Sequence, residues 1–416
     1  MKTVSGLDSL HAAHQRNVLA VSSPVWLANV PTPTNVAKAY PKEENIKVEE
    51  VRDHSLLEDI AKYPPAMKQP PTDHPEVQAV VKQLDWSKVP SIAPRKLVNG
   101  VFDLARYDYR KDADCWWSAS VCRQPKLDYL PEDVYQCPRP GDWGLTFDDG
   151  PLRVWSANNT LNQWQEPHLY NFLVENGKQK ATLFFIGANV IAYPAAAQRA
   201  LTDGHTICAH TWSHVQMTAL TNEEVVAQFY WTLKAIKQVL GITTRCWRPP
   251  FGDVDDRVRA IAWLMGMRTF LWDRDTTDWN LAGYSQGQHT MSKMDMIIKD
   301  WLNAHKNGTD DEHGHIVLQH ELNNLTVSMA EKWLPAIQKE FNVITPHACM
   351  DIALPYWEEN FVYPTVSNKS VSTTTTTAKA TNPAGNASHS IFASKMVMIH
   401  SILSAVATLL LAYAYL

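Results

Sequence analysis

Residues 143–151 read Trp-Gly-Leu-Thr-Phe-Asp-Asp-Gly-Pro, an apolar run that ends in two carboxylates and a turn. A short apolar run bounded by turn residues predicts a buried strand. Asp148 and Asp149 then stand at the end of that strand, where neighbouring side chains point in different directions. One carboxylate can therefore bind a metal ion while the other faces a substrate.

The same pattern, an apolar run followed by polar side chains, recurs four more times along the chain. The polar clusters are His210–His214, Arg248–Asp253, Asp275–Trp279 and Gln319–His320. In a barrel of parallel strands, the chemistry gathers where the carboxyl ends of the strands meet. The five clusters therefore predict a single site.

Strands and helices are predicted to alternate through this part of the chain. The apolar runs predict strands at Trp143–Phe147, Ala181–Ile186, His205–Ala209, Met267–Trp272, Ile316–Leu318 and Asn342–Ile344. Helical periodicity predicts helices at Glu166–Glu175, Val190–Ala200, Asn222–Leu240, Asp255–Leu264, Met291–Ala304 and Ser328–Lys339. This alternation indicates an α/β fold with a parallel sheet, and six or more repeats favour a (β/α) barrel over a small open sheet.

His210 and His214 are candidate metal ligands. A spacing of four residues predicts that both imidazoles lie on one face of a helical turn, where they can bind one cation. With Asp149 they make a set of two imidazoles and one carboxylate, which leaves coordination positions open for water and substrate.

A hydrolytic site also needs a base and an acid. Asp148 is the candidate base, and Arg248 is expected to pair with it and keep it ionised. His320 is the candidate acid, and Asp278 is expected to pair with it and raise its pKa.

The residues around these groups suggest how a substrate is held. Pro249 and Pro250 stiffen the chain before Phe251, whose backbone N–H is expected to donate to a developing oxyanion. Trp212 and Trp279 are candidate apolar walls for an acyl methyl group or a sugar face. Ordinary core packing is the alternative for both tryptophans.

The composition narrows the class of protein. The 416 residues are 45% hydrophobic and 19% charged, which permits a large core. The formal net charge of −5 argues against nucleic acid as a partner, because phosphate binding needs clustered Lys and Arg.

Six cysteines favour three disulfides and an oxidising compartment, although buried free thiols are the alternative. Sequence cannot choose among the 15 possible connectivities. The six residues are Cys115, Cys122, Cys137, Cys349, Cys208 and Cys246.

The C-terminal residues suggest membrane attachment. Between 365 and 390, 12 of 26 residues are Ser or Thr, a composition that predicts a disordered, O-glycosylated stalk. Residues 396–416 are almost entirely apolar and follow the small residues Gly385 and Asn386, as in a GPI-attachment signal. The apolar segment is also long enough for a tail-anchored transmembrane helix. Residues 1–20 lack the uninterrupted apolar segment of a secretory signal, so the route of export stays open.

We divide the chain into four parts. They are a partly extended, Pro-rich N-terminal region (1–136), the α/β domain (137–350), the Ser/Thr-rich stalk (351–390) and the apolar tail (391–416). Sequons predict N-glycosylation at Asn158, Asn307, Asn324 and Asn368.

The five clusters, in this order, resemble the five motifs of the NodB-homology polysaccharide deacetylases, carbohydrate esterase family four. The matching segments are Thr146–Gly150, His210–His214, Arg248–Gly252, Asp275–Trp279 and Leu318–His320. The likeness extends from about Cys137 to Cys349. Flanking segments such as Asp114–Trp117 are similar to fungal chitin deacetylases of the basidiomycete type.

The resemblance implies a distorted (β/α) barrel of the NodB-homology type that holds one Zn²⁺ or Co²⁺ ion. It implies hydrolysis of the N-acetyl groups of chitin to chitosan and acetate, in remodelling of the fungal cell wall. By motif, Asp149, His210 and His214 would hold the ion. Phe251 stands where the family often has Tyr, which changes little if the backbone is the donor.

The same motifs would make Asp148 the base and His320 the acid, with Arg248 and Asp278 adjusting their protonation. The expected partners are chitin, other cell-wall polysaccharides and, through a GPI lipid, the membrane. We expect a monomer in the cell wall and on the outer leaflet of the plasma membrane. Two alternatives stay open: a deacetylase of acetylxylan or peptidoglycan, and a non-catalytic chitin-binding wall protein.

Overall fold

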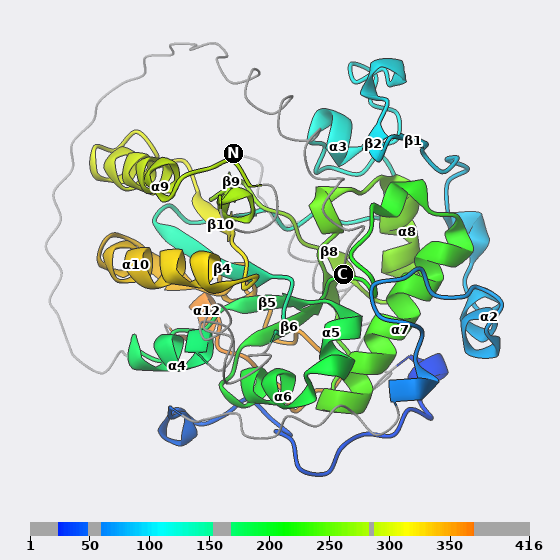
Figure 1. The fold of residues 1–416 in the computed structure, drawn as a ribbon, viewed down its shortest axis with the longest axis horizontal. Helices are drawn as coiled ribbons and strands as arrows, with labels where there is room; N and C mark the ends of the chain where they lie inside the picture. Colours follow the sequence, from blue (N-terminus) through cyan, green and yellow to red (C-terminus); the bar gives the residue numbers. More distant parts are fainter. Residues whose placement is uncertain (1–23, 49–59, 153–167, 283–286, 370–416) are drawn as a thin grey trace, which may run out of the picture.

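The computed structural model describes residues 24–48, 60–152, 168–282 and 287–369. Within these residues a curled sheet is surrounded by helices (Figure 1). Its nine strands are β3 (Gln136–Cys137), β4 (Asp142–Asp148), β5 (Thr182–Phe185), β6 (Thr206–Ala209), β7 (Cys246–Trp247), β8 (Arg268–Thr269), β9 (Arg274–Asp275), β10 (Gly314–Leu318) and β11 (Asn342–Ile344).

The strands are paired so that the sheet curls back on itself. Strands β10, β4, β5, β6, β7 and β8 are neighbours in that order and run parallel. The chain that leaves β8 forms a bridge from Phe270 to Val134, and it then pairs as β9 with β10. Because β9 follows β8 and joins the strand at the other end of the row, the sheet forms the predicted distorted barrel.

Six helices of eight or more residues and one shorter helix surround the sheet in the described part of the chain. They are α4 (His168–Glu175), α6 (Pro194–Thr202), α7 (Asn222–Leu240), α8 (Asp256–Leu264), α9 (Met291–Lys306) and α10 (Asn324–Glu340), with the shorter α5 (Gly187–Ala192) before α6. None of the helices in the described residues is long and apolar enough to cross a membrane.

The other elements are short. The helices are α2 (Pro75–Val81), α3 (Trp117–Ser120), α11 (Pro346–Cys349) and α12 (Val366–Lys369), and β1 (Leu97–Val98) pairs with β2 (Val101–Phe102) as a hairpin. Single 3₁₀ turns are η1 (Val25–Leu27), η2 (Glu43–Asn45), η3 (Ile60–Lys62), η4 (Trp86–Lys88), η5 (Leu104–Arg106), η7 (Met217–Ala219), η8 (Pro250–Gly252) and η9 (Asp278–Asn280).

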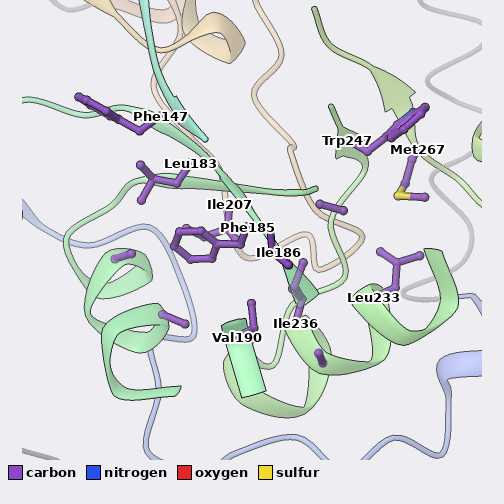
Figure 2. Packing of buried hydrophobic residues seen from close by; sticks show 14 of the residues in the cluster. Phe147, Leu183, Phe185, Ile186, Val190, Ile207, Leu233, Ile236, Trp247 and Met267 are labelled. Carbon is purple, nitrogen blue, oxygen red and sulfur yellow. The ribbon is translucent and has the colours of Figure 1, made fainter. Parts of the chain in front are cut away.

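Helix α7 has the bounds that the sequence predicts. Thr221 accepts a hydrogen bond from the Glu224 amide, and the Glu224 carboxylate accepts one from the Thr221 amide. This capping box satisfies amides that a helix otherwise leaves unpaired, and Gly241 ends the helix at a φ of 72°. Side chains of α5 and α7 fill the space against β4, β5 and β6, as Figure 2 shows.

One predicted helix is two helices in the structure. The expected helix at Val190–Ala200 is interrupted at Tyr193, which separates α5 from α6. Pro194 has no amide hydrogen and begins a helix more readily than it continues one. The predicted strand at Met267–Trp272 is also shorter, since only Arg268–Thr269 form β8.

The core extends beyond the predicted domain in both directions. Leu27 and Val77 of the N-terminal region belong to the same buried cluster as the strands. At the other end, Tyr356 accepts a hydrogen bond from the Ile207 amide of β6, and Tyr363 donates one to the His205 carbonyl. The predicted stalk boundary at 351 is therefore too early, because these buried tyrosines attach the following residues to the sheet. Gly385, Asn386 and the apolar tail lie outside the described residues.

All six cysteines form disulfides, as expected. The pairs are Cys115–Cys122, Cys137–Cys349 and Cys208–Cys246. The second pair joins β3 to α11 across 212 residues, so both ends of the predicted domain are covalently linked.

Two of the predicted glycosylation sites can be located. Asn307 is exposed at the end of α9, and Asn324 is half-buried at the start of α10. Asn158 lies outside the described residues, and the side chain of Asn368 is not described. Glycosylation at these positions stays a prediction.

Candidate metal centre and catalytic residues

Asp148 and Asp149 lie at the carboxyl end of β4, and both are buried. The Asp148 amide donates to the Gln319 carbonyl, while the Asp149 amide donates to Phe184 on the opposite side. Asp149 has a φ of 76°, which turns the backbone sharply between the two residues. The two carboxylates can therefore meet different partners, as the sequence predicts.

His210 and His214 lie in a loop after β6, so the predicted helical turn is wrong. Thr211 and His214 both have positive φ values, 64° and 51°, which no α-helix contains. The side chain of Gln228 in α7 accepts hydrogen bonds from the Trp212 and Ser213 amides. These contacts fold the loop back and bring the two imidazoles to a centroid distance of 4.9 Å.

Three side chains from two strand ends converge on one point. One ligand atom from each of Asp149, His210 and His214 lies within 4.8 Å of the others. Asp149 Oδ1 is 3.4 Å from His210 Nε2 and 3.2 Å from His214 Nε2. These separations suit an ion placed about 2 Å from each atom.

The hydrogen bonds of this cluster fit a cation. His210 Nδ1 lies 2.8 Å from the Arg248 carbonyl, which fixes the proton on Nδ1 and leaves the lone pair of Nε2 facing Asp149. Asp149 Oδ1 is buried and has no hydrogen-bond partner among the described residues. An acceptor that faces lone pairs without a donor is stabilised by a positive ion.

The electrostatics agree with this ligand set. Burial opposes ionisation of Asp149, but His214, His210 and His320 outweigh it and hold the pKa of that carboxyl below its usual range. Burial lowers the pKa of His214 to about 4, although Asp149 acts in the opposite direction. At neutral pH His214 is therefore an uncharged imidazole and Asp149 a carboxylate, the forms that bind metal ions.

Arg248 and Asp148 form a fully buried ion pair. Arg248 Nη1 donates to Asp148 Oδ1 at 2.7 Å and to Thr146 Oγ1 at 2.8 Å, and Nη2 donates to the Leu271 carbonyl at 2.9 Å. The guanidinium also lies 3.9 Å from the ring of Phe184. These contacts fix the orientation of the Asp148 carboxylate.

His320 and Asp278 form the second pair. His320 Nδ1 is 2.7 Å from Asp278 Oδ1, and the His320 amide donates to Asp278 Oδ2 at 2.8 Å. Burial favours the neutral ring, but Asp278, with help from Asp149 and Asp148, raises the pKa of His320 to about 10. His320 is therefore protonated at neutral pH and can supply a proton.

The three predicted substrate contacts lie in different environments. Phe251 is partly exposed beside the metal cluster, with its ring 4.7 Å from that of His214 and a φ of 58°. Trp279 is half-buried, and its Nε1 donates to Asp275. Trp212 is wrong as a substrate wall, because it is buried in the core, stacks on Tyr63 and donates to the Pro65 carbonyl.

Comparison with known proteins identifies this arrangement. Residues 135–270 match the polysaccharide deacetylase family. The chain carries a polysaccharide deacetylase domain. The matched segment contains the metal-site residues, the candidate base and Arg248. Asp278 and His320 come after its last residue.

Two fungal relatives cover more of the chain. Chitin deacetylase of Amylomyces rouxii is 43% identical over 286 residues, 68% of this chain and 64% of the relative. Chitin deacetylase 2 of Cryptococcus neoformans var. grubii is 40% identical over 318 residues, 73% of this chain and 66% of the relative. The chain thus spans just under two thirds of the length of each.

A solved structure of the chitin deacetylase from Colletotrichum lindemuthianum matches 53% of this chain and 92% of its own. The TM-score is 0.44 and the sequence identity 22%. The site described above rests on the contacts of this chain and not on that likeness.

Sequence reasoning assigned no role to Asp253, although this buried residue of the third polar cluster holds three segments of the chain together. Its carboxylate accepts hydrogen bonds from Trp116 and Ser118 of the N-terminal region. It also accepts bonds from the amide and hydroxyl of Thr218, which follows the histidine loop. Asp253 comes one residue after η8, so it links the Phe251 segment to the His214 segment. Its position next to a predicted motif was the only signal in the sequence.

We expect Asp253→Ala to destabilise the deacetylase domain by about 1–3 kcal/mol, because buried donors lose their acceptor. Denaturant unfolding followed by circular dichroism measures the loss. Asp108→Ala, at an exposed carboxylate, is the control and should leave the unfolding midpoint unchanged. An unchanged midpoint for Asp253→Ala would contradict the structural role assigned here.

Proposed function

We propose that this chain is a metal-dependent hydrolase that removes N-acetyl groups from chitin, giving chitosan and acetate. The observation that carries the proposal is the convergence of Asp149, His210 and His214 beside the buried pair of Asp148 and Arg248. The names and identities of the two fungal relatives support chitin as the polymer.

Asp149, His210 and His214 would hold the ion, which we propose to be Zn²⁺ or Co²⁺. When bound, the ion lowers the pKa of the attacking water and polarises the acetyl carbonyl. The three residues leave coordination positions open, as a catalytic site requires. Because the two imidazoles and the carboxylate are buried, their orientation is fixed before an ion binds.

Asp148 takes the proton that the attacking water loses as its oxygen bonds to the acetyl carbon. Arg248 keeps the Asp148 carboxylate oriented before the reaction begins. The backbone N–H of Phe251 donates to the oxygen that gains negative charge.

His320 gives its proton to the amide nitrogen as the carbon–nitrogen bond breaks. Acetate leaves, and the sugar keeps a free amine. Asp278 holds His320 in the protonated form that this step consumes. The partner of each group thus assigns its role: Arg248 pairs with the base, and Asp278 pairs with the acid.

We also propose that the protein acts as a monomer at the cell surface, in the cell wall and on the plasma membrane. Three disulfides support an oxidising compartment. The Ser/Thr-rich segment and apolar tail support attachment through a GPI lipid at Gly385 or Asn386.

We expect the full chain to release acetate from chitin oligomers in a metal-dependent way. Chelation should abolish release, and Zn²⁺ or Co²⁺ should restore it. Initial rates on chitin, acetylxylan and peptidoglycan fragments compare the possible substrates. Full activity in the chelated protein would exclude the proposed mechanism, and a higher rate on another polymer would replace chitin as the substrate.

Asp148→Asn should lower turnover by about 10²–10⁴-fold, because the amide cannot accept the proton of the water. Binding to chitin should persist, which a pull-down with the polymer measures. Asp142→Asn is the matched control at the opposite end of β4, where the carboxylate pairs with Arg139. A chain that binds chitin but shows no turnover before the substitution is the non-catalytic alternative.

Asp278→Asn should move the basic limb of the pH–rate profile to lower pH by about 1–3 units. Activity needs protonated His320, and Asp278 is the main group that raises its pKa to about 10. The rate therefore falls sooner as the pH rises. Asp295→Asn, which removes a carboxylate paired with Lys332, is the control. An unmoved basic limb would exclude His320 as the acid.

A further inference from the structure

A second cluster of histidines and carboxylates lies at the amino end of β10, away from the site described above. His313 and His315 flank the first residue of this strand, and Asp273 comes just before the neighbouring β9. His320 follows the carboxyl end of the same strand. His320 comes five residues after His315, about 17 Å along an extended chain, so the two clusters are independent.

One ligand atom from each of Asp273, His313 and His315 lies within 4.8 Å of the others. Asp273 Oδ1 accepts the Ile316 amide at 2.7 Å, and Oδ2 lies 2.5 Å from His315 Nδ1. The carboxylate is therefore fixed by the backbone, with its second oxygen directed at the imidazole.

Both imidazoles have one nitrogen occupied by a fixed oxygen. His313 Nδ1 lies 2.8 Å from the Gly314 carbonyl, and His315 Nε2 lies 2.9 Å from Asp310 Oδ2. A metal-binding histidine usually donates its second N–H to a carbonyl or carboxylate in this way, which directs the other nitrogen at the ion. The nitrogens that would face the ion are Nε2 of His313 and Nδ1 of His315, and the latter is hydrogen-bonded to Asp273 when no ion is bound.

We propose that Asp273, His313 and His315 bind a second divalent cation of the Zn²⁺ type, with a structural role. Two imidazoles and one carboxylate are ligands that Zn²⁺ accepts, and water completes the coordination. His313 is half-buried, so the ion can reach the site from solvent. The ion joins the residue before β9 to the start of β10, where the barrel closes.

The nearby charges permit this ion. Arg274 Nη2 donates to Asp310 Oδ1 at 2.7 Å, and Arg274 Nε donates to His315 Nδ1 at 3.3 Å. The charge of Arg274 balances that of Asp310. Without an ion, His315 Nδ1 is in contact with Asp273 and with Arg274, and an ion bound at this nitrogen would replace both contacts.

The test measures zinc bound per chain by the full-length protein in detergent, after removal of metal and addition of Zn²⁺. We expect two ions in the unchanged protein. His214→Ala should bind one ion, His313→Ala should bind one, and the double variant none. His168→Ala is the matched control, because His168 also pairs with a carboxylate at 2.7 Å, and it should bind two.

A second measurement uses stability instead of stoichiometry. Zn²⁺ should raise the melting temperature of His214→Ala but not of the double variant, since only the former keeps the second site. His313→Ala loaded with Zn²⁺ should release acetate at the unchanged rate. His313→Gln replaces His313→Ala if the latter does not fold.

Two results would overturn the second site: no ion in His214→Ala, or as many ions in His313→Ala as in the unchanged protein. These results do not depend on catalysis. A chain that binds zinc at His313 yet releases no acetate would refute the proposed function and leave the second site standing.

Discussion

Buried charge at the carboxyl ends of the strands is the constraint on which the rest of the structure depends. Arg248 is fully buried against Asp148, and His320 is buried against Asp278. A buried charge without a partner costs several kcal/mol, so each pair must form whenever the barrel forms. Asp149 is the exception, because its Oδ1 has no donor within the described residues. The folded chain therefore holds an unbalanced negative group that a cation stabilises.

Residues outside the five motifs hold the loops of the site in place. Gln228 of α7 fixes the backbone of the histidine loop, and Asp253 ties that loop to the Phe251 segment and to α3. The N-terminal region is part of this support, since its side chains enter both the Asp253 network and the hydrophobic core. A domain cut at residue 137 would lose donors to Asp253 as well as apolar contacts.

Local patterns were sufficient where a single element decides the outcome. Helical periodicity predicted the bounds of α7, and strand β11 was predicted to the residue. Errors arose where two signals in the sequence conflict. The apolar periodicity continues past Tyr193, but the helix ends there because a proline follows. The helical turn expected for His210 and His214 failed for a similar reason. The spacing of the two histidines does not distinguish a helix from a loop. The loop conformation depends on hydrogen bonds to Gln228, which belongs to another element, α7.

The sequence by itself determined six of the nine strands, the alternation of strands with helices, the polar clusters and the chemical types of the site residues, whereas β3, β7 and β9 were not predicted. The predicted features follow from local periodicity, which requires no knowledge of partners. Only the tertiary structure decided that Trp212 packs in the core, that Tyr356 and Tyr363 extend the domain, and which cysteines pair. It also brought His313, His315 and Asp273 together. Each of these outcomes depends on contacts between different elements of the fold, as does the pairing of β9 with β10, which are separated by about 40 residues in the chain.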